Sequence, residues 1–251
     1  MGYDGGMIAY VARELDTGRT LSAHENVQFP SYSTIKVLLA TAFWRRVTRG
    51  ELDDAAEYSF EPGACVGGSG VLQGFRFPAT VRLADLVHLA LVVSDNDATN
   101  IIADIVGFEH VNALADELGM TRTRMQRRMM DLGAAEAGRD NHTSAGDLAR
   151  LIEALSDGSL EPLVGERVLA SLVLQEHLDG IARYLPADAV YLGKCGDDWP
   201  ERRFAHDCAL VRRDDRDAVI VVMTSDAGGY EAVSRTGAAL YTALGDNAGS
   251  P

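Results

Sequence analysis

The chain has 251 residues, 47% of them apolar and 24% charged, a composition typical of a soluble globular protein with one large domain or two closely packed lobes. Its net charge of −14 opposes attraction to nucleic acid or to an anionic membrane, because both are polyanions. No apolar segment approaches the ~20 residues of a membrane span. We therefore expect no nucleic-acid or membrane partner.

The N-terminal residues and the cysteines bear on the cellular compartment. The N-terminus lacks the basic patch, apolar stretch and cleavage site of a secretory signal, which predicts a cytoplasmic protein. If a leader precedes this sequence, we expect a secreted or periplasmic protein instead. Cys65, Cys195 and Cys208 are an odd number of cysteines without metal-ligand spacing, so we expect free thiols.

A hairpin and then helices are predicted in the first half of the chain. Residues 7–15 have a strand-like pattern, residues 16–18 have turn chemistry, and residues 19–26 return as a second strand. After Pro30, apolar residues recur at helical spacing as far as Gly50. Further helices are predicted at residues 81–93, 98–106 and 110–118.

The second half begins with a loop and ends with strands. Residues 121–141 have little apolar periodicity and several arginines, which predicts a long surface loop. A helix at residues 145–155, with Asp147 in its first turn, and another at residues 165–174 should follow. Strands are then predicted at residues 189–196, 206–214 and 218–226, and a closing helix at residues 230–244.

This order of elements predicts an α+β fold. The two terminal segments bury their apolar faces most economically in one shared antiparallel sheet of about five strands, with helices packed against it as a sandwich. We expect a single domain over residues 1–251. Its sheet lobe would comprise residues 1–32 and 186–251, and an all-helical lobe at residues 33–185 would be inserted between them.

The first candidate site residues involve one of the only two lysines, since the chain has 21 arginines. Ser33 and Lys36 lie three residues apart at the start of a predicted helix, which places them on one face. In a desolvated pocket lysine can lose its proton and then accept the proton of serine, whereas arginine stays charged. The alternative is that Ser33 is only a helix N-cap.

Two further segments contain candidate residues. Ser94, Asp95 and Asn96 form a polar triplet between two apolar helices, for which a cap or a turn is the alternative. Lys194, the second lysine, lies on a predicted strand near a glycine that permits close backbone approach. A solvated charge at a sheet edge is the alternative for Lys194. The placement of both lysines in such contexts favours a functional role.

In this order, Ser-x-x-Lys, Ser-Asp-Asn and Lys-x-Gly resemble the signature of the penicillin-recognising serine hydrolases. The chain is similar to class A β-lactamases over nearly its whole length. The similar segments include DTGRTLSAHENVQFPSYSTIK, GSGVLQ, LVVSDNDATNIIADIVG and NHTSAGDLARLIEAL. This resemblance implies the β-lactamase/DD-peptidase-like fold and a chemistry that needs neither metal nor cofactor.

The resemblance also implies roles for the residues of the first two motifs. Ser33 would attack a carbonyl and become acylated, with Lys36 as its proton acceptor or relay. Ser94 would pass a proton to the leaving nitrogen. Asn96 would hold the amine of Lys36 and an amide of the substrate.

The third motif would border the substrate. Lys194 would supply positive potential near a substrate carboxylate, and Gly196 would permit close approach. The backbone N–H groups of Ser33 and Asp197 would form the oxyanion hole. Cys195 replaces the family's threonine or serine, and because a thiol is a poor donor, affinity for a carboxylate should fall. A small buried packing residue is the alternative role for Cys195.

Charges next to this motif depart from the family. Asp197 and Asp198 lie where penicillins carry their own negative charge, so they disfavour such a ligand. Arg202 or Arg203 could compensate, and solvated arginines in a turn are the alternative. The chain also begins directly at its first strand, without the N-terminal helix that family members pack against the sheet.

A second departure affects the final step of the reaction. In class A β-lactamases an omega-loop glutamate activates the water that hydrolyses the acyl-enzyme. Lining up the arginines puts Met129 near this place, and methionine cannot accept a proton. Asp131 or Glu136 is a candidate substitute, and a solvated surface acid is the alternative.

The sequence therefore predicts a β-lactamase-like serine hydrolase that cleaves a small-molecule β-lactam, amide or ester through an acyl-enzyme on Ser33, with weak or altered deacylation. A biosynthetic esterase or amidase on the same fold is one alternative. A binding or sensing protein that is acylated without turnover is another, and a member that retains only the fold is a third. The sequence predicts no oligomeric state.

Overall fold

The computed structural model describes residues 6–60, 65–76, 78–198, 200–214 and 216–245. Within them, five strands form one antiparallel sheet in the spatial order β2-β1-β9-β8-β7. These strands are β1 (Met7–Glu14), β2 (Thr20–Ala23), β7 (Val190–Asp197), β8 (Phe204–Arg213) and β9 (Arg216–Ser225). Strands from both ends of the chain thus share one sheet, as the element order predicts.

β1 connects the N-terminal hairpin to the C-terminal strands. Its Val11 pairs with Ser22 of β2 on one side and with Val221 of β9 on the other. Because successive side chains of a strand face opposite sides, β9 supplies apolar side chains to two cores. Val221 packs in the core shared with the helical lobe, and Ile220 packs in the smaller core on the opposite face.

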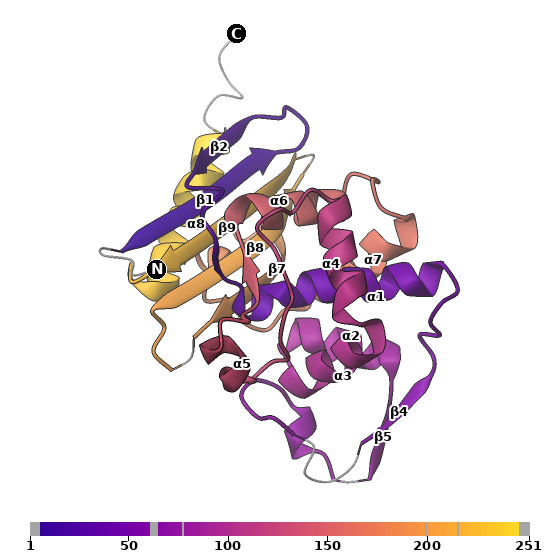
Figure 1. The fold of residues 1–251 in the computed structure, drawn as a ribbon. Helices are drawn as coiled ribbons and strands as arrows, with labels where there is room; N and C mark the ends of the chain where they lie inside the picture. The colour runs from indigo at the N-terminus through magenta and orange to yellow at the C-terminus, as the bar shows by residue number, and fades with distance from the viewer. Residues whose placement is uncertain (1–5, 61–64, 77, 199, 215, 246–251) are drawn as a thin grey trace.

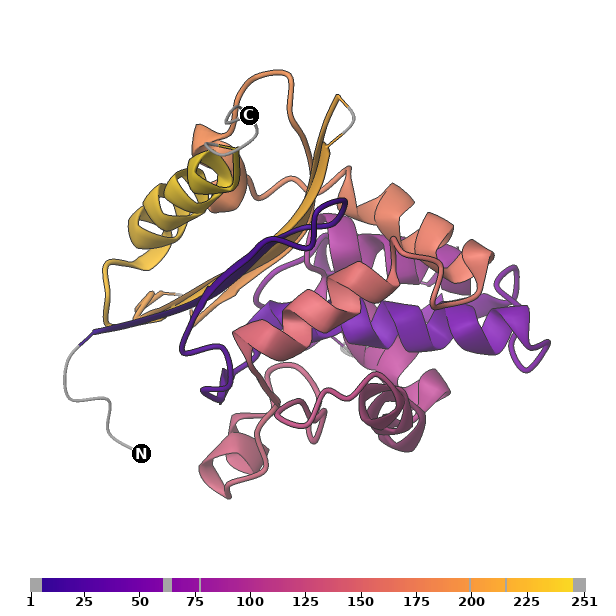
Figure 2. The same cartoon turned by 90° about the horizontal axis from the view of Figure 1, so that it is seen from above.

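Helices cover both faces of this sheet. α8 (Gly229–Gly245) lies on one face, where Leu240 and Tyr241 bury their side chains. The inserted helices lie on the other face, so that the sheet is the middle layer of the molecule (Figures 1 and 2). Among the inserted helices, α6 (Ala145–Ala154) contacts β1, β8 and β9 directly.

α1 (Ile35–Thr48) runs through the centre of the helical lobe. Its residues 35–44 are all buried, which is typical of a helix surrounded by others. It contacts four neighbouring helices, among the described residues: α2 (Leu83–Val92), α3 (Asn96–Val106), α4 (Phe108–Glu117) and α7 (Pro162–Leu172). The side chain of Lys36 is therefore inside a core, where a charge is costly.

Two short strand pairs were absent from the sequence prediction. β4 (Glu57–Phe60) pairs with β5 (Ala79–Arg82), so the helix expected from residue 81 begins at Leu83. β3 (Phe29–Pro30) pairs with β6 (His142–Thr143). Such pairs are too short to produce a periodic pattern and join segments far apart in the chain, so only the tertiary structure reveals them.

The segment at residues 121–141 is mostly loop, as predicted, and contains one short helix, α5 (Leu132–Glu136). Short 3-10 turns occur at η1 (Tyr32–Thr34), η2 (Leu72–Gly74) and η3 (Ile181–Tyr184). In the part of the chain that the structure describes, no helix is long and apolar enough to cross a membrane.

Candidate active site

Ser33 lies in the 3-10 turn η1, directly before α1. The preceding residue, Tyr32, has a φ of 45°, a conformation that non-glycine residues adopt only when their surroundings hold them. The ring of Tyr32 packs against those of Phe204 and His206, each with 5.8 Å between ring centroids. The N-cap of α1 is Thr34, so the alternative that Ser33 caps this helix is wrong.

Lys36 is completely buried and is bonded to the Ser-Asp-Asn segment. Its Nζ donates to the backbone oxygen of Ser94 at 2.7 Å and to Asn96 Oδ1 at 2.9 Å, and lies 3.1 Å from Ser94 Oγ. Burial and the nearby Lys194 lower the pKa of Lys36 well below its usual value. The amine is therefore held where its neutral form is favoured.

The Ser94-Asp95-Asn96 segment is both a helix cap and part of this cluster. Asp95 is the N-cap of α3, and its carboxylate accepts a hydrogen bond from Ala98 N at 2.9 Å, so the cap alternative holds for this residue. Ser94 has a φ of 56° and its side chain faces Lys36 instead. Asn96 Nδ2 donates to Gly67 O at 3.0 Å.

Lys194 is fully buried although its strand, β7, lies at the edge of the sheet. Its Nζ donates to Cys195 O at 3.0 Å, and burial lowers its pKa. The alternative of a solvated edge charge is therefore wrong. Cys195 is also buried, with Gln175 Nε2 3.8 Å from its Sγ, and burial raises the pKa of the thiol. This agrees with the packing role considered for Cys195.

β7 approaches the nucleophile turn closely at Gly196. A Cβ built on Gly196 would lie 2.6 Å from Ser33 N and 3.0 Å from Thr34 N, so no side chain fits there. This is the close backbone approach that the sequence predicts for the glycine. It brings the backbone of Asp197, the next residue of β7, beside the turn that carries Ser33.

A cleft opens at this junction of the sheet and the helical lobe. Its lining includes Ser33, Ser69, Ser94, His177, Asp179, Cys195, Gly196, Asp197, Arg202 and Tyr230. Five of the predicted residues therefore meet in one place. Lys36 and Asn96 lie behind Ser94. Lys194 lies behind Cys195.

Sequence analysis did not select four of these lining residues, Ser69, His177, Asp179 and Tyr230. Two signals were available: the polar residues between Gln175 and Asp179, and the segment GSGVLQ, which contains Ser69 and resembles the family. Tyr230 carried no such signal, and only the fold brings it to the cleft.

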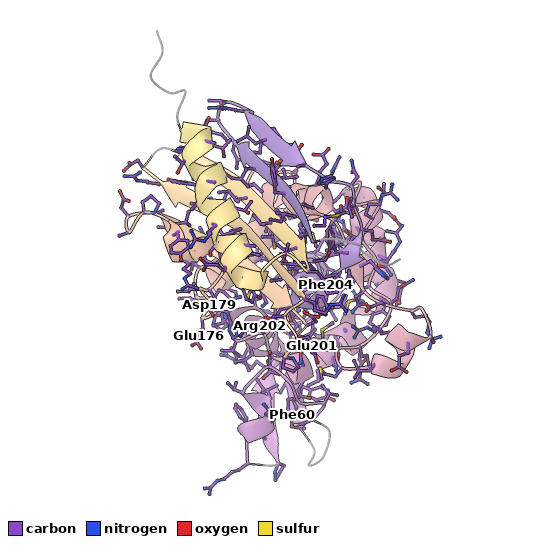
Figure 3. All side chains as sticks on the ribbon, turned by 90° about the vertical axis from the view of Figure 1, so that its left-hand side faces the viewer. Phe60, Glu176, Asp179, Glu201, Arg202 and Phe204 are labelled. Carbon is purple, nitrogen blue, oxygen red and sulfur yellow. The ribbon has the colours of Figure 1, made fainter. Side chains whose placement is uncertain are left out.

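The acids and arginines beyond Gly196 separate in space. Asp198 Oδ1 accepts a hydrogen bond from Phe204 N at 2.8 Å within its own turn, so Asp197 is the acid of the pair that lines the cleft. Arg203 pairs with Asp226 at 2.8 Å, whereas Arg202 lines the cleft. Figure 3 shows Arg202, Glu201, Glu176 and Asp179 gathered below one end of α8.

Comparison with known proteins agrees with this architecture. A model described as the Beta-lactamase enzyme family matches residues 1–245. This chain belongs to the beta-lactamase enzyme family. A β-lactamase from Sphaerobacter thermophilus is 26% identical, with a TM-score of 0.89 covering 96% of this chain and 92% of that one. An ancestral class A β-lactamase is 22% identical, with a TM-score of 0.85 covering 96% and 95%.

One relative is a regulatory protein of β-lactamase rather than a β-lactamase itself. The β-lactamase regulatory protein BlaB of Streptomyces cacaoi is 31% identical over 140 residues. These residues are 55% of this chain and 45% of that protein, so the match spans less than half of the relative's length. Together these findings identify a divergent class A β-lactamase-like chain with an α+β fold.

In this β-lactamase-family chain, the backbone of Met129 is held by Asn100, which lies one helical turn after Asn96 on α3. Asn100, four residues after Asn96, accepts a hydrogen bond from Met129 N at 2.7 Å and donates to Met129 O at 3.1 Å. The thioether side chain is buried in the main core. A residue whose side chain has no proton-accepting group thus occupies the position bonded to Asn100.

Neither acid considered as a substitute for the family's glutamate lines the cleft. Asp131 is exposed and caps α5, where its Oδ1 accepts a hydrogen bond from Ala134 N at 3.0 Å. Glu136 is exposed at the other end of that helix. The loop that carries them is closed by an ion pair between Arg127 and Asp140 at 2.6 Å.

Proposed function

We propose that this chain is a serine acyl-transfer hydrolase that forms a covalent acyl-enzyme on Ser33. The observation that carries the proposal is the buried amine of Lys36, which lies within hydrogen-bond distance of Ser94 Oγ and Asn96 Oδ1 and has a lowered pKa. A group with these surroundings directly behind a cleft is typical of a functional site. The substrate class is a β-lactam, amide or ester.

The proton movements follow from the hydrogen-bonding capacity of these groups. The backbone oxygen of Ser94 and Asn96 Oδ1 can only accept, so they occupy two N–H groups of Lys36. A neutral amine keeps one lone pair, which can accept a proton from the attacking Ser33 hydroxyl. Ser94 Oγ, 3.1 Å from the amine, can relay this proton to the leaving group.

The negative charge that develops on the carbonyl oxygen requires fixed donors. Backbone N–H groups of Ser33 and Asp197 serve as these donors in the proposal, since β7 and the nucleophile turn touch at Gly196. Lys194 adds positive potential behind the same strand. Cys195 supplies no strong donor to a substrate carboxylate, because its thiol is buried and contacts Gln175.

A second candidate function is an acyl-compound sensor that stays acylated. Met129 favours it, because the buried thioether cannot activate water for deacylation. The similarity to part of a β-lactamase regulatory protein points in the same direction. Both candidates share the first half of the reaction and differ only in the lifetime of the acyl-enzyme.

Intact mass spectrometry tests both candidates. The protein is exposed to a penicillin and to an activated phenyl ester, and mass is followed with time. An adduct that disappears indicates turnover, and one that persists indicates a sensor. Ser33→Ala should abolish the adduct, whereas Ser159→Ala, on the surface, should keep it. Undiminished labelling of Ser33→Ala would refute the nucleophile.

A further inference from the structure

Hydrolysis of an acyl-enzyme needs a proton acceptor, and neither Met129 nor Asp131 supplies one at the cleft. Among the described residues that line the cleft, the side chains that titrate are His177, Asp179, Cys195, Asp197, Arg202 and Tyr230. Burial raises the pKa of Cys195 and that of Tyr230, so both keep their protons. Arginine cannot act as a base. His177, Asp179 and Asp197 therefore remain as candidate proton acceptors.

The segment that carries His177 is fixed to both lobes. Glu176 N donates to Val92 O at 3.2 Å, at the end of α2. Gln175 Oε1 accepts from His177 N at 3.2 Å, and Gln175 Nε2 lies 3.8 Å from the Cys195 sulfur on β7. His177 is therefore held across the cleft opening, between the end of α2 and the strand that borders Ser33.

The orientation of the imidazole leaves one nitrogen available. The backbone of Val93, the residue that directly precedes Ser94, raises the pKa of His177, as a carbonyl facing the ring does. A backbone carbonyl only accepts, so the nitrogen facing it carries the proton and the other has a free lone pair. This places a proton acceptor beside the proposed leaving-group relay of Ser94.

Charged groups from several elements face this imidazole. Lys194 and Asp197 lie on β7, Glu176 is its neighbour, and Asp179 and Arg202 line the same cleft. Burial and the charge of Lys194 lower the pKa of His177, and Asp197, Glu176 and the backbone of Val93 only partly oppose this. At neutral pH the ring is therefore mainly uncharged.

We propose that His177 is the general base that activates the attacking water during deacylation of Ser33. This inference rests on the proposed acyl-enzyme. The imidazole takes a proton from water while the water oxygen bonds to the acyl carbon. The bond from that carbon to Ser33 Oγ then breaks, and Oγ takes the hydroxyl proton of Ser94 as Ser94 takes the proton of the imidazolium. His177 is then neutral again, and one water is consumed.

The position of His177 also determines which acyl-enzymes turn over. Water activated there approaches from the side on which Ser94 delivers a proton to the leaving group. An ester or a linear amide vacates this space when its leaving group departs. The leaving nitrogen of a β-lactam stays tethered to the acyl group and blocks it. The preferred substrates are therefore esters or linear amides, and penicillin adducts persist.

The test compares His177→Gln with the parent protein, using a p-nitrophenyl ester and intact mass spectrometry. Glutamine can still donate to the Val93 carbonyl but cannot act as a base. We expect acylation of Ser33 within about twofold of the parent and at least tenfold slower loss of the adduct. Added imidazole should restore the loss in His177→Ala. His110→Gln, an exposed histidine on α4, is the matched control.

The pH profile provides a second readout that a structural role would not move. In the parent, the rate constant for adduct loss should rise with pH through a pKa below the usual histidine value, and this rise should vanish in His177→Gln. Normal acylation with unchanged adduct loss in His177→Gln, or slowed loss in Asp179→Asn alone, would overturn the inference only. No adduct in the parent with any ester would overturn the proposed function and the inference with it.

Discussion

Lys36 Nζ and Asn96 Oδ1, 60 residues apart in the chain, lie 2.9 Å from each other in the interior of the helical lobe. The pair joins the helix that follows Ser33 to the helix that follows Ser94. Within the described residues, no carboxylate forms an ion pair with Lys36, whose partners are the Ser94 and Asn96 oxygens. A neutral amine satisfies this environment without an uncompensated buried charge.

Replacement of Lys36 by arginine, whose guanidinium keeps its charge, should strongly slow acylation. Guanidinium cannot accept the proton of Ser33, so we expect the rate constant for ester acylation to fall by ~10²–10⁴-fold. Stopped-flow measurement of p-nitrophenol release gives this rate. Arg128→Lys, on the exposed surface, is the control for a basic exchange. A fall of less than tenfold in Lys36→Arg would contradict the role of the amine.

Introduction of a carboxylate at Met129 should shorten the life of a penicillin adduct. The Asn100 hydrogen bonds hold the Met129 backbone, and the resemblance puts Met129 near the family's glutamate, so we expect the carboxylate of Met129→Glu to act as a base on the acyl-enzyme. We expect deacylation to accelerate by ~10²-fold or more. Burial of the new carboxylate should lower the free energy of unfolding by ~1–3 kcal/mol.

Leu132→Glu is the matched control for that substitution. Leu132 is 61% exposed, whereas Met129 is 7% exposed, so the same carboxylate three residues later stays in solvent. Mass spectrometry of the penicillin adduct over hours compares the two variants. Equal acceleration of deacylation in both variants would show that a carboxylate anywhere on this loop has the effect, and that the Met129 position is not special.

A methyl group at Gly196 should disturb the contact between β7 and the nucleophile turn. The added Cβ would meet Ser33 N at 2.6 Å, and both backbones would have to shift. Because an oxyanion donor contributes ~10²–10³-fold, we expect acylation in Gly196→Ala to fall by a factor of this size. Gly74→Ala, where nothing lies within 4 Å of the new Cβ, should acylate at the parent rate.

Acid should destabilise the fold through His206. This buried ring bonds Pro30 O and Thr224 N, and burial lowers the pKa of His206 to about 4 from 6.5. The unfolded chain therefore binds a proton at a higher pH than the folded one. The neutral His206 contributes to the free energy of unfolding in full above pH 6.5. This contribution is lost as pH falls toward 4, by about 3 kcal/mol.

Urea unfolding at several pH values measures this loss. His206→Gln removes the titrating group, so its free energy of unfolding should fall less between pH 6.5 and 4 than that of the parent. Asp207, with a pKa raised to about 6 by burial, acts with the opposite sign and remains in both proteins. A difference between parent and variant that does not change with pH would refute the assignment to His206.

The sequence by itself determined the order of elements, the shared sheet and the motif residues. Period-two and period-3.6 patterns are local, so β1, β9 and α1 could be predicted from neighbouring residues. The scarcity of lysine directed attention to Lys36 and Lys194 without any contact being known. Asn100 carried no such signal, because its function as a clamp on Met129 depends on a residue 29 positions away.

The tertiary structure decided which residues share the cleft and in what state. Burial, which lowers the pKa of Lys36 and of His177, depends on atoms contributed by distant elements, as does the close approach at Gly196. Tyr230, in the first turn of α8, and His177, in the segment after α7, reach the cleft only when α8 and α2 pack on their layers. Local patterns specify the elements, whereas desolvation and proximity are properties of the packed whole.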